Sequence, residues 1–253
     1  MNKLPKITLW FWIMKIAATT LGETAGDLLS ITLKVGYGVS SLILGGFFLL
    51  TLLTQLRVKN YHPFLYWTVI LATSTAGTTL SDYMDRTLQL GYTNGAAILL
   101  SILLFTFAFW LYSGDSLSVN EIKSKKVELL YWIAILFSNT LGTATGDFLA
   151  ADSGLGFAKS AFLIGNLLAL TCLAYFYTKI SRVFLFWFAF VLTRPFGATV
   201  GDVLTKAKNK GGLDLGTLGS SAVLGGILVA VILFTSYREK RANPRCVAQL
   251  HSA

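Results

Sequence analysis

Charged residues are scarce in this sequence. Asp, Glu, Lys and Arg make up 13% of its 253 residues, about half the share of roughly 25% that is usual in soluble domains. With 54% hydrophobic residues and a mean hydropathy of +0.64, the shortage excludes an ordinary soluble enzyme, a disordered chain and a fibrous repeat. In a soluble protein, the net charge of +9 would suggest that the chain binds nucleic acid. In so apolar a chain it reflects membrane topology, and no nucleic-acid partner is expected.

Cysteine and histidine are equally rare, with two of each. Cys172 lies within an apolar run and Cys246 near the C-terminus, so a disulfide between them is not expected. His62 and His251 lie in a loop and in the tail, which excludes a metal site built from thiolates or imidazoles. A Gly-Asp-Ser-Leu sequence contains Ser116, but no histidine is placed to activate that hydroxyl. The chain is therefore not expected to be an enzyme or to carry a cofactor.

Apolar runs dominate what is present. Each is roughly 20 residues long, enough to cross a hydrocarbon core of about 30 Å as a helix. The fold class predicted is all-α integral membrane, with the lipid bilayer as a partner. The eight predicted transmembrane helices cover residues 7–27, 37–56, 63–83, 92–112, 129–149, 157–178, 183–203 and 215–236.

An internal repeat organises these runs. Four segments align without a gap, and in each a tryptophan is followed by a glycine ten residues later and by an aspartate fifteen residues later. The tryptophans are Trp12, Trp67, Trp132 and Trp187. Each repeat contains two predicted spans, so we expect four tandem helical hairpins, all with the same orientation in the membrane.

The spacing of the repeats predicts two similar halves. The four tryptophans are separated by 55, 65 and 55 residues, and the longer middle interval indicates a linker. The expected organisation is a first half at 1–112, a cytoplasmic linker at 113–128, a second half at 129–237 and a basic tail at 238–253.

The fourfold Trp-x9-Gly-x4-Asp pattern resembles a bacterial family of membrane-anchored proteins made of four tandem repeats of unknown function. The resemblance covers nearly the whole chain and implies an architecture of two-helix units. Residues 22–27, Gly-Glu-Thr-Ala-Gly-Asp, are also similar to the Glu-x-Gly-Asp signature of cation/proton exchangers, with one residue more between the acids.

Basic residues predict the topology. Most lie in segments on the side of the termini, including Lys3, Arg57, Lys125 and Arg182. The positive-inside rule then places both termini in the cytoplasm, and the resemblance implies a multi-pass protein of the bacterial inner membrane. The four tryptophans fall near the cytoplasmic ends of their spans, where we expect them to anchor the helices at the interface.

Small residues recur four apart on the first helix of each repeat. Residues at this spacing share one helix face and let two helices approach closely in lipid. The glycines expected to pack in this way are Gly22, Gly26, Gly77, Gly142, Gly146, Gly197 and Gly201. Such contacts would gather the first helices of the repeats around a central axis.

The repeated aspartates are the candidate functional residues: Asp27, Asp82, Asp147 and Asp202. Acids within a membrane mark a cation or proton pathway. The alternative is that they cap the adjoining loops. Asp82 and Asp202 have Arg86 and Lys206 four residues later, whereas Asp27 and Asp147 have no base there.

The first repeat adds Glu23 one turn before Asp27 on the same face, where the two acids could share a proton. Carboxylate and hydroxyl oxygens suit a hard cation such as Mg²⁺, Mn²⁺ or Ca²⁺. The metal-ligand set predicted is Asp27, Asp147 and Glu23, with Asp82, Asp202, Thr20, Thr24 and Thr143 as further cation- or proton-binding residues.

Two basic residues fall deep within predicted spans. Lys15 lies about a third of the way along the first, and Arg194 replaces the Thr, Ser and Asn of its sister repeats. We expect both to supply counter-charge to a central carboxylate. Snorkelling to the cytoplasmic surface is the alternative for Lys15.

These features favour a transporter of a small cation, with divalent metal exchanged for protons at a central acidic site. Two alternatives stay open: a pseudo-fourfold cation channel, and a membrane scaffold or regulator that transports nothing. A homo-oligomer is compatible with each of them.

Overall fold

The computed structural model describes all residues except 1–2, 120–121, 123 and 243–253. It contains the α-helices α1 (Leu9–Asp27), α2 (Tyr37–Arg57), α3 (Pro63–Asp82), α4 (Gly91–Tyr112), α5 (Lys125–Asp147), α6 (Gly156–Tyr177), α7 (Arg182–Thr205) and α8 (Thr217–Ala242). The predicted helices are thus present. The start of the predicted basic tail belongs to α8, and its residues 243–253 lie outside the described residues.

Local sequence explains where the helices begin. Ser124 precedes α5, and its hydroxyl accepts a hydrogen bond from the Val127 amide at 3.2 Å. This is the usual way in which serine satisfies a free amide at a helix start. Pro63 opens α3, where its missing amide costs nothing. Because Ser124 caps α5, this helix begins at Lys125, four residues earlier than the hydropathy predicted.

The helices α1, α3 and α5 are each followed by a π-helical turn, which is wider than an α-helical turn. The π-helices η1 (Leu28–Thr32), η2 (Tyr83–Thr87) and η4 (Phe148–Asp152) directly follow the repeated aspartates of the first three repeats. The fourth repeat instead continues α-helical to Thr205 and then forms the short 3₁₀ helix η5 (Lys208–Lys210). π-helical turns occur frequently at functional sites, and here they adjoin the candidate acids.

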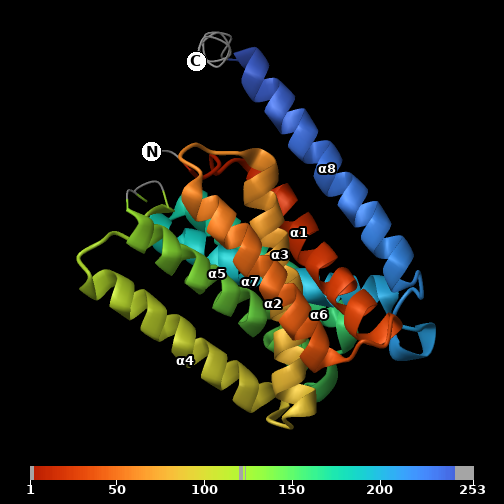
Figure 1. The fold of residues 1–253 in the computed structure, drawn as a ribbon. Coiled ribbons are helices and arrows are strands. Elements are labelled where there is room, and N and C mark those ends of the chain that lie inside the picture. The colour runs from red at the N-terminus through yellow and green to blue at the C-terminus, as the bar shows by residue number, and fades with distance from the viewer. Residues whose placement is uncertain (1–2, 120–121, 123, 243–253) are drawn as a thin grey trace.

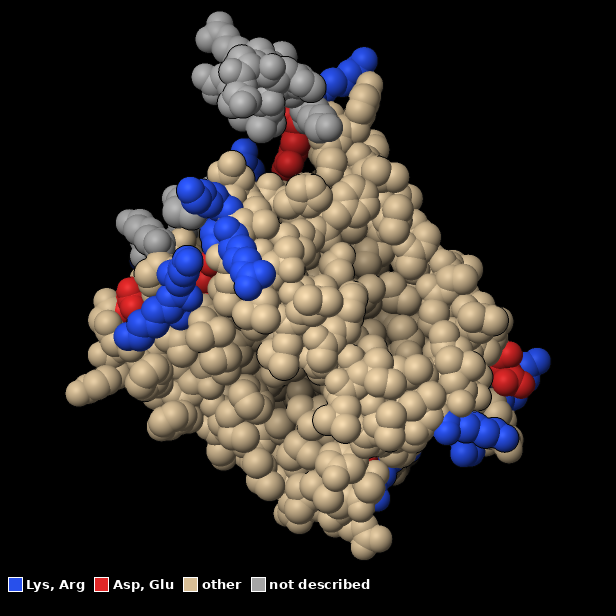
Figure 2. All heavy atoms as spheres, viewed as in Figure 1, with Lys and Arg blue, Asp and Glu red and all other residues tan. Residues whose placement is uncertain are grey.

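Among the described residues, six helices are long and apolar enough to cross a membrane: α2, α4, α5 with η4, α6, α7 and α8. Figure 2 shows charged side chains near opposite ends of the visible face and a broad uncharged band between them. The described part of the chain is therefore helical, and several of its helices could cross a membrane, which is consistent with a multi-pass membrane protein. α1 and α3 fall short because much of their length is Thr, Ser, Gly and acidic residues, so eight spans remains a prediction.

The odd-numbered helices form a closed ring. α1 packs against α3, α3 against α5, α5 against α7, and α7 against α1. Glycines lie where these helices approach each other. Gly77 of α3 meets the backbone of Asn139 and Thr140 on α5, and Gly197 of α7 meets that of Thr19 on α1.

The even-numbered helices surround this ring, each displaced by one repeat. α2 packs on α3, α4 on α5, α6 on α7, and α8 returns to α1. Figure 1 shows α4 and α8 at opposite outer edges of the bundle. The expectation of simple hairpins needs correction here, because within the described residues no repeat packs its two helices extensively against each other. Each repeat covers its successor, and the last covers the first.

Candidate functional site

Every fourth residue of the inner helices contributes to a buried column. Residues four apart share one helix face, and the face that begins one residue before each tryptophan carries five layers. The layers are Phe11, Tyr66, Tyr131 and Phe186; Lys15, Ile70, Ile135 and Phe190; Thr19, Ser74, Asn139 and Arg194; Glu23, Thr78, Thr143 and Ala198; and Asp27, Asp82, Asp147 and Asp202. All twenty residues are buried.

The aromatic layer closes the column at the end nearest the termini. Each of its members contacts the tryptophan of the next repeat, with ring centroids 5.5–6.0 Å apart. The Tyr66 and Tyr131 hydroxyls hydrogen-bond to each other at 2.7 Å. The prediction that the tryptophans anchor the helices at the interface is wrong for Trp67, Trp132 and Trp187, which are buried in this circle of rings.

Lys15 occupies the next layer and is fully buried. Its ammonium donates to Asn139 Oδ1 at 3.3 Å and lies 3.9 Å from the centre of the Phe190 ring. Asn139 in turn donates to the Thr73 hydroxyl at 2.8 Å. Lys15 therefore points across the ring from α1 to α5, and it does not snorkel to the surface.

Arg194 fills the middle of the column. Its guanidinium donates to Glu23 at 2.9 Å, to the Thr143 hydroxyl at 2.7 Å and to the Thr78 hydroxyl at 2.5 Å. It also donates to the backbone carbonyl of Thr19 at 3.4 Å. One side chain from α7 thus reaches all three other inner helices. Its guanidinium forms a buried ion pair with Glu23.

The four aspartates form the last layer and are joined in pairs. Arg86 lies 2.7 Å from Asp82 and 3.1 Å from Asp147. Lys206 lies 3.0 Å from Asp202 and 2.6 Å from Asp27. Each base therefore bridges its own repeat to the next one.

This arrangement corrects the contrast drawn from the sequence. Asp27 and Asp147 lack a base one turn later in the chain, yet both are ion-paired. The i,i+4 spacing identified the local partners of Arg86 and Lys206. The second partners were missed because they come from another helix.

Three carboxylates converge in one place. Oxygen atoms of Glu23, Asp27 and Asp202 lie within 4.8 Å of one another, and all three residues are buried. Of the predicted metal-ligand set, Glu23 and Asp27 are brought together, and the third acid in reach is Asp202. Asp147 belongs to the Arg86 bridge.

The predicted hydroxyl ligands divide differently. Thr143 lies in the column and accepts a hydrogen bond from Arg194. Thr20 donates to the carbonyl of Ile16 within its own helix. Thr24 accepts from Ser221 of α8 at 2.8 Å, which places its hydroxyl on the outer side of α1. Thr20 and Thr24 are therefore not part of the acidic cluster in this structure.

The cluster lies beside an opening to the surface. A cavity of about 290 Å³ is lined by residues from the end of α1, η1, the end of α7 and the loop before α8. Asp27 and Lys206 are among these residues. Lys206 is 24% exposed, whereas Asp27 and Asp202 are nearly inaccessible. Lys206 is therefore the more accessible member of both of its ion pairs.

A repeat described as a Repeat of Unknown Function (DUF347) matches the chain four times, over residues 10–61, 65–116, 130–181 and 185–241. The chain belongs to the DUF347 repeat family. Each DUF347 repeat contributes one inner helix, one residue to every layer of the column and one outer helix. No curated protein and no solved structure matches the chain.

Within the DUF347 ring, charge is distributed unevenly. The column and the bases that reach it hold five carboxylates, namely Glu23, Asp27, Asp82, Asp147 and Asp202, against four basic groups, namely Lys15, Arg86, Arg194 and Lys206. The second, third and fourth layers each contain a single ionisable residue, Lys15, Arg194 and Glu23 respectively. The fold is pseudo-fourfold, whereas the chemistry is not.

Proposed function

We propose that the protein transports a small cation across a membrane and exchanges it for protons. The observation that carries the proposal is the convergence of Glu23, Asp27 and Asp202 beside a surface cavity. Buried acids within a membrane bundle are costly, and they characteristically serve ion pathways. A cluster of carboxylate oxygens suits a hard cation, of which a divalent metal is the preferred candidate.

In this mechanism Lys206 holds the place of the transported ion. Its ammonium binds Asp27 and Asp202 at 2.6 and 3.0 Å. An incoming cation displaces the ammonium toward the cavity, where the long and flexible side chain of lysine finds water. When the cation leaves, the ammonium returns and neutralises the acids again.

The charge balance supports coupling to protons. With five carboxylates and four bases in and around the column, the acids outnumber the bases by one. One proton shared among the carboxylates makes the column neutral. A divalent cation that replaces the single charge of the Lys206 ammonium adds one positive charge to the column, and loss of this proton restores neutrality. One divalent cation is then exchanged for one proton.

Closure of the column at its other end favours a transporter over a channel. Arg194 spans the ring, and beyond it lie a layer of large apolar side chains around Lys15 and the aromatic layer. A cation at Asp27 would face this barrier on one side and the cavity on the other. Passage then requires the inner helices to move, as in alternating access.

The proposed setting is a bacterial inner membrane, crossed eight times, with both termini in the cytoplasm. Basic residues near the termini support this orientation. The cavity beside Asp27 then opens on the outer side.

Flux measurements test the proposal. In proteoliposomes with and without a pH gradient, we expect Glu23→Gln, Asp27→Asn and Asp202→Asn each to lower cation flux at least about tenfold, because each removes one of three converging charges. Glu23→Gln also leaves Arg194 without its ion-pair partner, so flux is compared at equal amounts of folded protein. Asp147→Asn lies on the Arg86 bridge and should have a smaller effect. The assay covers Mg²⁺, Mn²⁺, Ca²⁺, Na⁺ and K⁺, with proton movement followed by a pH-sensitive dye.

Asp152→Asn is the matched control. This aspartate lies on the same side of the bundle, at the end of η4, and is exposed, so its variant should transport like the parent. Undiminished flux in all three cluster variants would contradict the proposed site. No flux of any tested cation in the parent protein would favour a membrane scaffold instead.

A further inference from the structure

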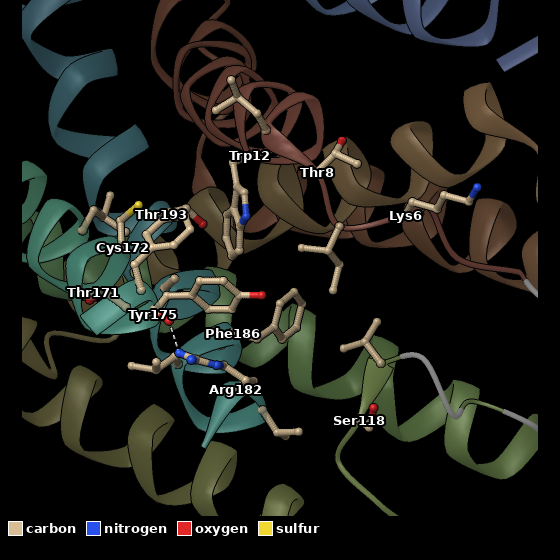
Figure 3. A pocket seen from close by; sticks show the side chains of 18 of the residues that line it. Lys6, Thr8, Trp12, Ser118, Thr171, Cys172, Tyr175, Arg182, Phe186 and Thr193 are labelled. Carbon is tan, nitrogen blue, oxygen red and sulfur yellow. Dashed lines mark hydrogen bonds between the residues drawn. The ribbon is translucent and has the colours of Figure 1, made fainter. Parts of the chain in front are cut away.

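A second and larger cavity lies at the opposite end of the molecule. Its volume is about 770 Å³, and it is bounded by the start of α1, the end of α6, the start of α7 and residues 117–119. This volume is typical of pockets that hold organic ligands. Figure 3 shows Trp12 entering from one wall, with Tyr175 and Phe186 on the facing wall.

The lining of this cavity changes along its length. The part further from the helix ends is lined by apolar side chains such as Ile16, Leu168 and Ala189. Its outer part contains two basic residues, Lys6 before α1 and Arg182 at the start of α7. No acidic residue is among the described residues that line it. A ligand that fits is apolar at one end and anionic at the other.

The length of the cavity matches one leaflet of a membrane. It extends along α7 from Arg182 to Thr193, and a helix rises about 1.5 Å per residue. These eleven steps give roughly 16 Å, which is about half of the approximately 30 Å hydrocarbon core. The basic residues lie at helix ends, where lipid headgroups would be.

From these features we infer that the cavity binds an anionic phospholipid from the leaflet on the side of the termini. One acyl chain lies between α1, α6 and α7, and the phosphate lies beside Arg182. Basic pockets between membrane helices are established binding sites for anionic headgroups. This inference is independent of the proposed transport.

Arg182 is oriented for this role. Its guanidinium donates to the carbonyl of Tyr175 and lies 4.5 Å from the centre of the Tyr175 ring. A guanidinium has five N–H donors in a planar fork, so one bond to a carbonyl leaves donors for two phosphate oxygens. Lys6 lies on another wall of the cavity and adds a second positive charge to its outer part, with its ammonium directed away from Arg182 (Figure 3).

Native mass spectrometry tests the inference. The full chain is titrated with phosphatidylglycerol and with phosphatidylcholine of identical acyl chains. We expect one phosphatidylglycerol to bind at least about tenfold more tightly than phosphatidylcholine. Arg182→Gln and Lys6→Gln should each weaken phosphatidylglycerol binding about fivefold, the effect of one basic residue near an anionic lipid surface.

Two further variants make the result specific. Lys59→Gln removes an exposed basic residue from the same end of the molecule but outside the cavity, and it should bind phosphatidylglycerol like the parent. Ala189→Phe narrows the apolar part and should weaken both lipids. Equal binding of the two lipids by the parent protein, or equal losses in Arg182→Gln and Lys59→Gln, would overturn the inference.

Discussion

Gly197→Ala is expected to lower the midpoint of thermal unfolding by about 5–10 °C, which corresponds to roughly 2–3 kcal/mol for a protein of this size. A Cβ atom at Gly197 would lie 2.8 Å from the backbone carbonyl carbon of Thr19. Backbone cannot rotate away as a side chain can, so α7 and α1 would have to separate. The measurement is thermal unfolding of the purified protein in detergent.

Gly46→Ala provides the matched control. Gly46 lies within α2, and a Cβ atom there would meet nothing within 4 Å. Alanine is the better helix former by about 1 kcal/mol, so this variant should be as stable as the parent or slightly more stable. Similar losses in both variants would show that the close approach of α7 to α1 is not what makes Gly197 necessary.

Arg194→Met is expected to be more damaging still, with a loss of about 3–5 kcal/mol in unfolding free energy. That is the usual cost of leaving one member of a buried ion pair without its partner. Methionine removes every hydrogen bond that the guanidinium makes, and Glu23 is left buried and charged on α1. Thermal unfolding again measures the effect.

The double variant Arg194→Met/Glu23→Gln separates this explanation from a simple packing defect. Removing both charges removes the penalty of an isolated carboxylate, so part of the lost stability should return. A double variant that is less stable than Arg194→Met alone would contradict the assignment of Glu23 as the partner of Arg194.

The helices and their inner ring follow from patterns that lie within each repeat. Hydropathy located the helix ends to within four residues, except the end of α8, which lies six residues beyond the predicted span. The spacing of Gly22 and Gly26, or of Gly197 and Gly201, indicated the close faces of the inner helices. Both signals are local, because a helix face is defined by residues three or four apart.

What could not be predicted depends on how the repeats meet. A pattern repeated along one chain does not state whether α2 packs on α1 or on α3, since both offer similar surfaces. For the same reason the sequence did not predict the second ion-pair partners of Arg86 and Lys206, which are Asp147 and Asp27 on neighbouring helices. The environment of Trp132 was predicted wrongly for a related reason. A tryptophan near a helix end is typical of a membrane interface, whereas Trp132 is buried against Tyr66 of the preceding repeat, a contact that the sequence does not reveal.

The return of the last repeat to the first has a consequence for biosynthesis. Asp27 and its partner Lys206 are 179 residues apart, and Glu23 and Arg194 are 171 apart. At translation rates of roughly 5–20 residues per second, about 9–36 s pass between the synthesis of Asp27 and that of Lys206. During that time α1 lacks both its counter-charges and the cover of α8, so the first helix made is among the last to reach its final surroundings.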